Sequence, residues 1–151
     1  MLKIPKTRIM VFGTFDILHE GHLNFFKQAR ALAKNPYLIV SIARDQNVKK
    51  IKGRRPTLNQ GQRLAAVKTS QLVDRSVLGG LKTYLAHIKK EHPGIIALGY
   101  DQTAYVDNLK RDLAKAGIKP KIRRLKAYKP KIHKSSLLKR KESFKIGGFM
   151  L

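Results

Sequence analysis

The sequence has no cysteine among its 151 residues, and only nine Asp and Glu stand against 33 Lys and Arg. Without thiols the chain forms no disulfide, which excludes a disulfide-stapled scaffold and fits a reducing compartment. A zinc centre is disfavoured as well, because two nearby histidines alone do not complete its ligand set. The few carboxylates include no obvious pair for general acid–base catalysis.

Long hydrophobic runs are also missing. No apolar segment approaches the roughly 20 residues that a membrane-spanning helix needs. The first six residues, MLKIPK, lack the apolar stretch of a secretory signal. We therefore expect a cytoplasmic protein with no membrane partner. The chain is 42% hydrophobic, so it can bury a core, and its length fits one domain.

The formal net charge is +24. Such a charge suits nucleic-acid binding, where Lys and Arg release counterions from phosphates. It equally suits a cleft that attracts polyanionic nucleotides, and a basic cytosolic habitat would produce the same composition. No RNA-reading motif interleaves aromatic residues with the charges, so dedicated nucleic-acid binding is disfavoured.

Apolar runs alternate with helical patterns along the chain, which predicts βαβ units and a parallel sheet. The expected fold is α/β, a Rossmann-like three-layer sandwich with a five-stranded parallel sheet. Residues 1–138 would form this domain, and residues 139–151 would form a basic C-terminal tail. The expected strands are Arg8–Phe12, Tyr37–Ala43, Arg75–Leu78, Ile95–Leu98 and Lys121–Leu125.

Helices are expected between these strands. Asn59 and Gln62 have the spacing of a capping box, which predicts a helix start. The segment Arg44–Pro56 is strongly basic and contains Gly53, so we expect an exposed loop there. A short helix is expected from Ser135. The main helices are expected to run from the first strand to about Lys34 and over Gln60–Ser70, Lys82–Glu91 and Thr103–Lys115.

The most informative segment is GTFDILHEGH at residues 13–22, directly after the first expected strand. A tight turn from strand to helix is where parallel α/β folds bind phosphates, because backbone N–H groups and the positive helix end meet there. His19 and His22 would add two imidazole groups to the same small volume. Such a site suits an anion that gains charge during a reaction.

Two later segments offer further ligand contacts. Asp101 follows the fourth expected strand, where it can accept a ribose hydroxyl, bind a metal-bridging water or cap the next helix. Ser135 and Ser136 form either a second phosphate cradle or a simple helix cap. Basic residues of the central segment are either triphosphate ligands or a solvated surface. The candidate cations are Lys52, Arg54, Arg55 and Arg63.

Residues 8–137 resemble the archaeal-type FAD synthase family of the cytidylyltransferase-like nucleotidyltransferases. The resemblance implies transfer of AMP from ATP to FMN, giving FAD and pyrophosphate. We expect Mg²⁺ or another divalent cation to bridge the phosphates, held mainly by them with few protein oxygens. The segments that carry the resemblance are GTFDILH at 13–19, ARD at 43–45, KGRRP at 52–56, LG at 78–79, LGYDQT at 98–103, YK at 128–129 and SS at 135–136.

The resemblance also implies roles for individual residues. His19 and His22 would be catalytic, because they would stabilise charge at the α-phosphate. We expect Lys52 and Arg63 to bind the departing pyrophosphate. Ala127 stands where the family pattern suggests Gly, so the backbone before Tyr128 departs from that pattern. The implied nucleotide-binding residues are Thr14, Phe15, His19, Glu20, Gly21, His22, Asp101, Tyr128, Ser135 and Ser136.

The acceptor substrate is not fixed by these residues. A relative that transfers CMP to glycerol 3-phosphate shares the first motif but usually carries Trp and Arg where this chain has Gln102 and Lys134. These departures favour FMN. A cytidylyltransferase of a small phosphorylated acceptor and a non-catalytic nucleotide- or RNA-binding module stay as alternatives. ATP and FMN are the expected partners, and a homodimer is compatible with the sequence, although repulsion between +24 subunits opposes it.

Overall fold

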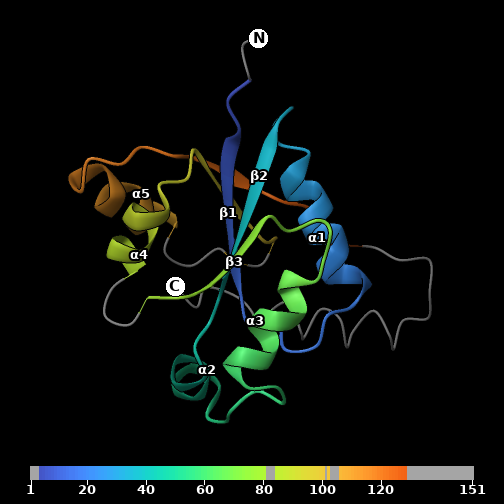
Figure 1. Ribbon diagram of the computed structural model, residues 1–151. Helices are drawn as coiled ribbons and strands as arrows, with labels where there is room; N and C mark the ends of the chain where they lie inside the picture. The colour runs from blue at the N-terminus through green and yellow to red at the C-terminus, as the bar shows by residue number, and fades with distance from the viewer. Residues whose placement is uncertain (1–3, 81–83, 101, 103–105, 129–151) are drawn as a thin grey trace.

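The computed structural model describes residues 4–80, 84–100, 102 and 106–128. Its centre is a five-stranded sheet in the order β3-β2-β1-β4-β5 (Figure 1). All strand pairs are parallel, so the predicted α/β sandwich with five parallel strands is confirmed. The strands are β1 (Thr7–Gly13), β2 (Pro36–Ile42), β3 (Arg75–Leu78), β4 (Ile95–Leu98) and β5 (Lys121–Arg124).

The central strand β1 contributes side chains to the hydrophobic cores on both faces of the sheet. Its side chains alternate between the two faces, as a pleated strand requires. Ile9 and Val11 belong to one apolar cluster, whereas Met10 and Phe12 belong to the other. Because β1 pairs with both β2 and β4, the direction of chain progression reverses beside it. In open parallel sheets, ligands bind at the carboxyl ends of the strands that flank such a reversal.

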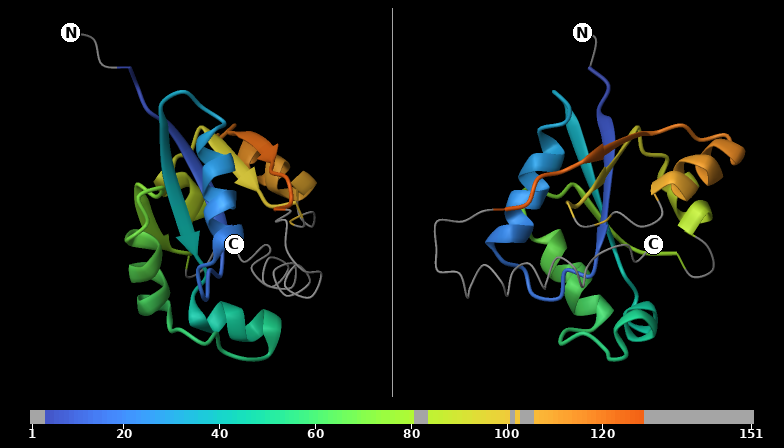
Figure 2. Two further views of the ribbon diagram at one scale, coloured as in Figure 1. Left: turned by 90° about the vertical axis from the view of Figure 1, so that its right-hand side faces the viewer. Right: turned by 180° about the vertical axis from the view of Figure 1, so that it is seen from behind.

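Helices cover both faces of the sheet, and Figures 1 and 2 show them as two separate layers. One layer contains α1 (Glu20–Arg30) and α3 (Gln60–Lys68), and the other contains α4 (Tyr84–Glu91) and α5 (Val106–Lys115). Each fully buried apolar side chain in these layers contributes about 1.5–3 kcal/mol. The buried helix residues are Phe25, Phe26, Ala29 and Val67 in the first layer and Ile88, Leu109 and Leu113 in the second.

A helix, α2 (Asp45–Lys52), occupies the segment that the sequence predicts as an exposed loop. That prediction is wrong, because it weighed basic composition above helix-end signals. Asp45 lies in the first turn and three lysines lie in the last, which complements the helix dipole. Val48 is buried beside Ala43, and Gly53 ends the helix with a φ of 78°. Figure 1 places α2 beyond the carboxyl end of β2.

The remaining helix boundaries follow the sequence signals closely. Asn59 Oδ1 accepts from Gln62 N at 2.8 Å, and Gln62 Oε1 accepts from Asn59 N at 2.9 Å, which confirms the predicted capping box. Helix α1 ends at Arg30, earlier than the expected Lys34. The helix expected from Ser135 and the tail at 139–151 lie outside the described residues. In the part that the structure describes, no helix has the length and apolarity to span a membrane.

The sheet has one strongly basic edge. β5 pairs only with β4 in the described sheet, and its sequence is KIRR. Lys121 and Arg123 are exposed, whereas Arg124 donates to the carbonyls of Gly99 and Gln102. The edge strand therefore combines a structural arginine with solvated cations.

Candidate functional site

Two imidazoles meet at the start of α1. His19 is the N-cap of the helix, and its Nδ1 accepts a hydrogen bond from Gly21 N at 3.0 Å. Because Nδ1 is an acceptor, the ring proton lies on Nε2. His22 follows three residues later, and the two rings stack with centroids 3.9 Å apart and an interplanar angle of 24°. The HxGH spacing thus brings both side chains together, as the sequence predicts.

Both rings line a pocket of about 340 Å³, the lower end of the range for small-molecule sites. Three cations, Lys52, Arg54 and Arg55, line the same pocket. Within the described ranges, none of the three has a hydrogen bond or ion pair to another protein group. Asp16 is the one carboxylate in the lining, so the pocket offers an excess of positive charge to an anionic ligand. Its remaining lining residues are Thr14, Phe15, Asp16, Ile17, Pro56 and Thr57.

Asp16 holds the basic loop beside the histidines, a role that the sequence analysis missed. Its two carboxylate oxygens accept from Thr57 N and Leu58 N, each at 2.8 Å. These bonds fix the segment that follows the three cations. No local sequence signal identifies this pairing, because the partners are backbone groups more than 40 positions away.

The electrostatic state of the histidine pair follows from burial. His22 is 6% exposed, and this burial, with a smaller contribution from His19, lowers its pKa from 6.5 to about 3. A hydrogen bond with the Ile17 backbone opposes the shift only in part. At neutral pH His22 is therefore a neutral imidazole that donates through one N–H group. Burial also lowers the pKa of Lys52; the carboxylate of Asp16 opposes this shift, whereas Arg54 and Arg63 act in the same direction as burial.

The depressed pKa of His22 predicts a loss of stability in mild acid. The unfolded chain binds a proton near pH 6.5, whereas the folded chain binds it only near pH 3. The stabilisation is complete above pH 6.5 and declines as the pH falls toward 3. Between pH 7 and pH 5, the free energy of unfolding should fall by about 2 kcal/mol more in the wild type than in His22→Asn. Urea denaturation at both pH values measures this difference. An equal loss of unfolding free energy in the wild type and in His22→Asn would contradict it.

The turn before the histidines has a strained backbone. Phe15 has a φ of 50°, a left-handed conformation that costs a bulky residue about 1–3 kcal/mol. Its ring is nearly buried, 5.3 Å from the rings of both His22 and Phe26. A Cβ at Gly13 would lie 2.8 Å from this ring, so the close approach requires glycine there. The expected nucleotide contact of Phe15 thus lies next to the core rather than on an open surface.

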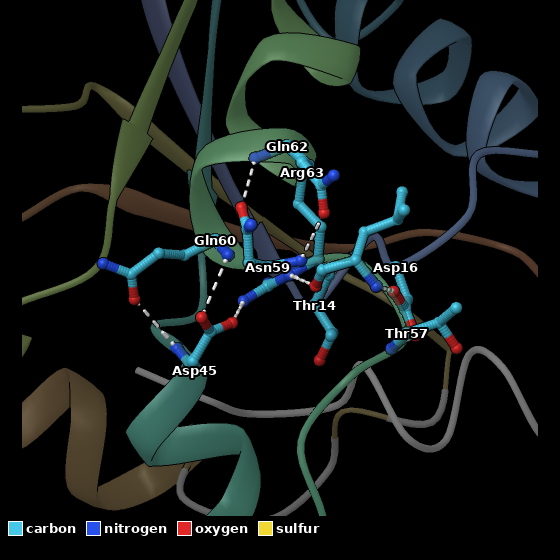
Figure 3. Close-up of polar contacts among 9 residues, drawn as sticks. Thr14, Asp16, Asp45, Thr57, Asn59, Gln60, Gln62 and Arg63 are labelled. Atoms are coloured by element: carbon cyan, nitrogen blue, oxygen red, sulfur yellow. Dashed lines mark hydrogen bonds and ion pairs between the residues drawn. The ribbon is translucent and has the colours of Figure 1, made fainter.

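Arg63 does not occupy the position that the sequence suggests. It is 0% exposed and is absent from the residues that line the histidine pocket. Its guanidinium donates to the carbonyls of Leu58 and Thr14 at 3.1 and 2.8 Å and pairs with Asp45 at 2.7 Å (Figure 3). With all three nitrogens engaged inside the protein, Arg63 cannot also bind pyrophosphate. It instead supports the backbone at Thr14, one residue before the strained Phe15.

The loop after β4 is held by a residue that the sequence analysis did not assign. Gln102 is buried, its Oε1 accepts from Gly99 N at 2.7 Å, and its Nε2 donates to the carbonyl of Phe12 at 3.2 Å. The amide thereby connects the carboxyl ends of β1 and β4, where the neighbouring strands diverge. The predicted site residues Asp101, Ser135 and Ser136 lie outside the described part of the chain.

The segment after β5 returns to the start of α1. Gln28 makes two hydrogen bonds to the backbone of Lys126, both 2.8 Å long. Tyr128 Oη then donates to Glu20 Oε2 at 3.1 Å. Glu20 and Tyr128, two expected nucleotide-binding residues, are therefore in direct contact. Glu20 directly follows His19 in the chain.

Residues 10–142 match the cytidylyltransferase-like family. The chain is 43% identical to an FAD synthase from Korarchaeum cryptofilum over 129 residues, which is 85% of this chain and 86% of that protein. It is also 43% identical to an FAD synthase from Methanosarcina barkeri over 119 residues, with 79% and 83% coverage.

Solved structures agree on the fold. The crystal structure of a lipopolysaccharide core biosynthesis protein from Thermoplasma volcanium superposes with a TM-score of 0.76 at 34% identity, covering 83% of this chain and all of that chain. A pantoate-β-alanine ligase from Francisella tularensis, complexed with β-γ ATP and β-alanine, gives a TM-score of 0.57 at 17% identity. It covers 87% of this chain and 62% of that one, and it shows the shared fold alone.

Proposed function

This chain belongs to the cytidylyltransferase-like family and, within it, to the FAD synthases, and we propose that its His19–His22 pocket transfers AMP from ATP to FMN. The products are FAD and pyrophosphate. The observation that supports this use of the pocket is the stacked histidine pair beside three cations that make no hydrogen bond or salt bridge among the described residues.

The chemistry of the acceptor explains why the pocket needs no strong general base. FMN carries a phosphate monoester, which is already an anion at neutral pH and attacks the α-phosphorus directly. Asp16 is the only carboxylate among the pocket's lining residues, and both of its oxygens accept backbone N–H groups. Alignment of the reactants and stabilisation of charge are then the main catalytic contributions.

The two histidines are suited to donate to the phosphate as its charge grows. The His19 proton lies on Nε2, since Nδ1 accepts from Gly21 N. His22 is neutral, so it offers a hydrogen bond rather than a permanent charge, and its single N–H group must turn from the Ile17 backbone to donate to the phosphate. A donor that is already oriented, as the capping bond orients His19, gains strength as the reaction proceeds and needs no reorganisation.

Permanent charge comes from the basic loop. Lys52 lines the pocket, and we retain its expected role at the pyrophosphate. Arg63 is engaged in internal contacts, so we assign Arg54 in its place as the second cation that binds the pyrophosphate. Cations here would offset the negative charge that accumulates on the leaving group.

A divalent cation fits this site if the triphosphate itself supplies most of the ligands. The described residues contain no group of three His, Asp or Glu arranged to hold a metal. Asp16 accepts hydrogen bonds from the backbone of the basic loop, and Glu20 accepts one from Tyr128 Oη. Mg²⁺ prefers such mixed sites of phosphate oxygens and water, and it would supply further charge neutralisation when bound.

The function is tested by product analysis. Purified protein incubated with Mg²⁺, ATP and FMN is expected to release FAD and pyrophosphate in equal amounts. Riboflavin should give no product, because it lacks the attacking phosphate. CTP with glycerol 3-phosphate should also stay unchanged. Formation of CDP-glycerol, or salt-sensitive RNA binding without FAD formation, would instead favour one of the two alternatives.

A cytoplasmic location and a homodimer stay predictions. The absence of cysteine is compatible with a reducing compartment. Sedimentation equilibrium at several salt concentrations tests the dimer, because added salt screens repulsion between highly charged subunits.

A further inference from the structure

A second hollow adjoins the histidine pocket and has no part in the function proposed so far. Its volume is about 460 Å³. Arg55 lines this hollow and the histidine pocket alike, so the two cavities share a wall. A group bound against Arg55 in the hollow is therefore next to the reacting phosphate. The lining residues are Arg44, Asp45, Gln46, Arg55, Asn59 and Gln60.

The hollow offers hydrogen-bond donors rather than acceptors. Asn59 Oδ1 accepts from Gln62 N, and Gln60 Oε1 accepts from Asp45 N at 3.0 Å. Both amide oxygens are thus turned toward backbone groups, as Figure 3 shows. The NH₂ group of each amide has no protein acceptor among the described residues and is available to a ligand.

The one carboxylate of the hollow does not oppose an anion. Asp45 pairs with Arg63 through Oδ1 at 2.7 Å and accepts from Gln60 N through Oδ2 at 3.2 Å. Its charge is compensated by a buried guanidinium, and both of its oxygens are occupied. The cations Arg44 and Arg55 therefore dominate the electrostatics of this cavity.

The two arginines differ in how they are held. Arg44 follows β2, and its Nε donates to the carbonyl of Gly79 at 2.7 Å, which orients the guanidinium. In the described chain this carbonyl is its one hydrogen-bond acceptor, so both Nη groups stay available. Arg55 is exposed and has no such bond there. The pair combines one oriented cation with one exposed side chain that lines both cavities.

We propose that this hollow binds the phosphate monoester of the acceptor substrate, with Arg44 and Arg55 as its ligands. The proposal rests on the function given above, in which the acceptor is FMN. The hollow follows β2 and meets the histidine pocket at Arg55. A phosphate bound by Arg44 and Arg55 therefore lies beside the pocket in which we place the α-phosphorus of ATP.

Flavin binding tests the assignment without requiring turnover. Quenching of flavin fluorescence by the wild type should show FMN bound at least about 10-fold more tightly than riboflavin, which lacks the phosphate. Arg44→Gln and Arg55→Gln should each weaken FMN binding by about 10- to 100-fold and leave riboflavin binding unchanged. In the assay of FAD formation, Arg44→Gln should raise the KM for FMN and not that for ATP, whereas Arg55→Gln should raise both, because Arg55 also lines the histidine pocket. Lys49→Gln removes an exposed cation of α2 outside the hollow and should bind both flavins like the wild type.

The outcomes separate this proposal from the function on which it rests. A wild type that binds FMN no more tightly than riboflavin overturns the assignment, as does an unchanged FMN preference in Arg55→Gln. Arg55 has no protein bond among the described residues, so its replacement tests the hollow even if Arg44→Gln melts at a lower temperature. FAD formation with normal KM for FMN in both variants overturns the hollow alone. Arginine-dependent FMN binding without FAD formation overturns the proposed activity alone.

Discussion

Replacing His19 by asparagine is expected to lower the turnover of FAD formation by about 100- to 1000-fold. The variant removes the Nε2 donor that faces the reacting phosphate in our mechanism. Asparagine is a favoured N-cap residue, so the backbone N–H bond that His19 provides to α1 is preserved. Single-turnover formation of FAD at saturating ATP and FMN measures the effect on the chemical step, and thermal melting checks the fold.

His19→Ala is the matched comparison, because alanine removes the donor and the cap together. It should lose turnover to the same extent as His19→Asn and additionally lose about 0.5–2 kcal/mol of stability. His22→Asn should fall in turnover by a similar factor, and the double variant by little more, since the two groups act on one phosphate. Wild-type turnover in His19→Asn would remove the histidine pair from the mechanism.

The second large effect is expected from Arg63→Met, which should lower the free energy of unfolding by about 3–5 kcal/mol. The substitution keeps the apolar stem but leaves Asp45 and the carbonyls of Thr14 and Leu58 without their buried donor. Loss of the bond to Thr14 also releases the strained turn at Phe15, so turnover should fall with stability. Urea denaturation at pH 7 measures the first effect.

Arg54→Met serves as the control for this prediction. It removes the same charge from an exposed side chain, so stability should change by about 0.5 kcal/mol or less. Its affinity for ATP should fall, because Arg54 lines the histidine pocket. If Arg63→Met unfolds at the same urea concentration as Arg54→Met, Arg63 is not the support of the turn.

The strands and the histidine pair could be predicted because their signals are local. Buried parallel strands are continuous apolar runs, and β4, whose four residues IIAL are all buried, has the predicted bounds. The partly buried edge strand β3 has the predicted bounds as well. The i, i+3 spacing at a helix start is sufficient to stack His19 on His22. The contacts of Asp45 with Gln60 and of Asp16 with the backbone of Thr57 and Leu58 depend instead on residues distant in sequence, so they could not be predicted this way.

Arg63 and α2 show the physical limit most clearly. A buried arginine and a solvated one are identical in sequence, and only the position of Asp45 and Thr14 in space distinguishes them. The Asp45–Lys52 segment has few apolar residues, so its helical character depends on Val48 and on charges at its ends. Composition therefore indicated an exposed loop where tertiary contacts support a helix.

The cationic border at β5 has a consequence for concentrated solutions. An unpaired strand exposes amide and carbonyl groups that can recruit the matching strand of another molecule. Lys121 and Arg123 place like charges on any two such borders that approach each other. Arginine does not titrate under physiological conditions, so this resistance to fibril growth should persist from acid to alkaline pH and weaken only as ionic strength rises.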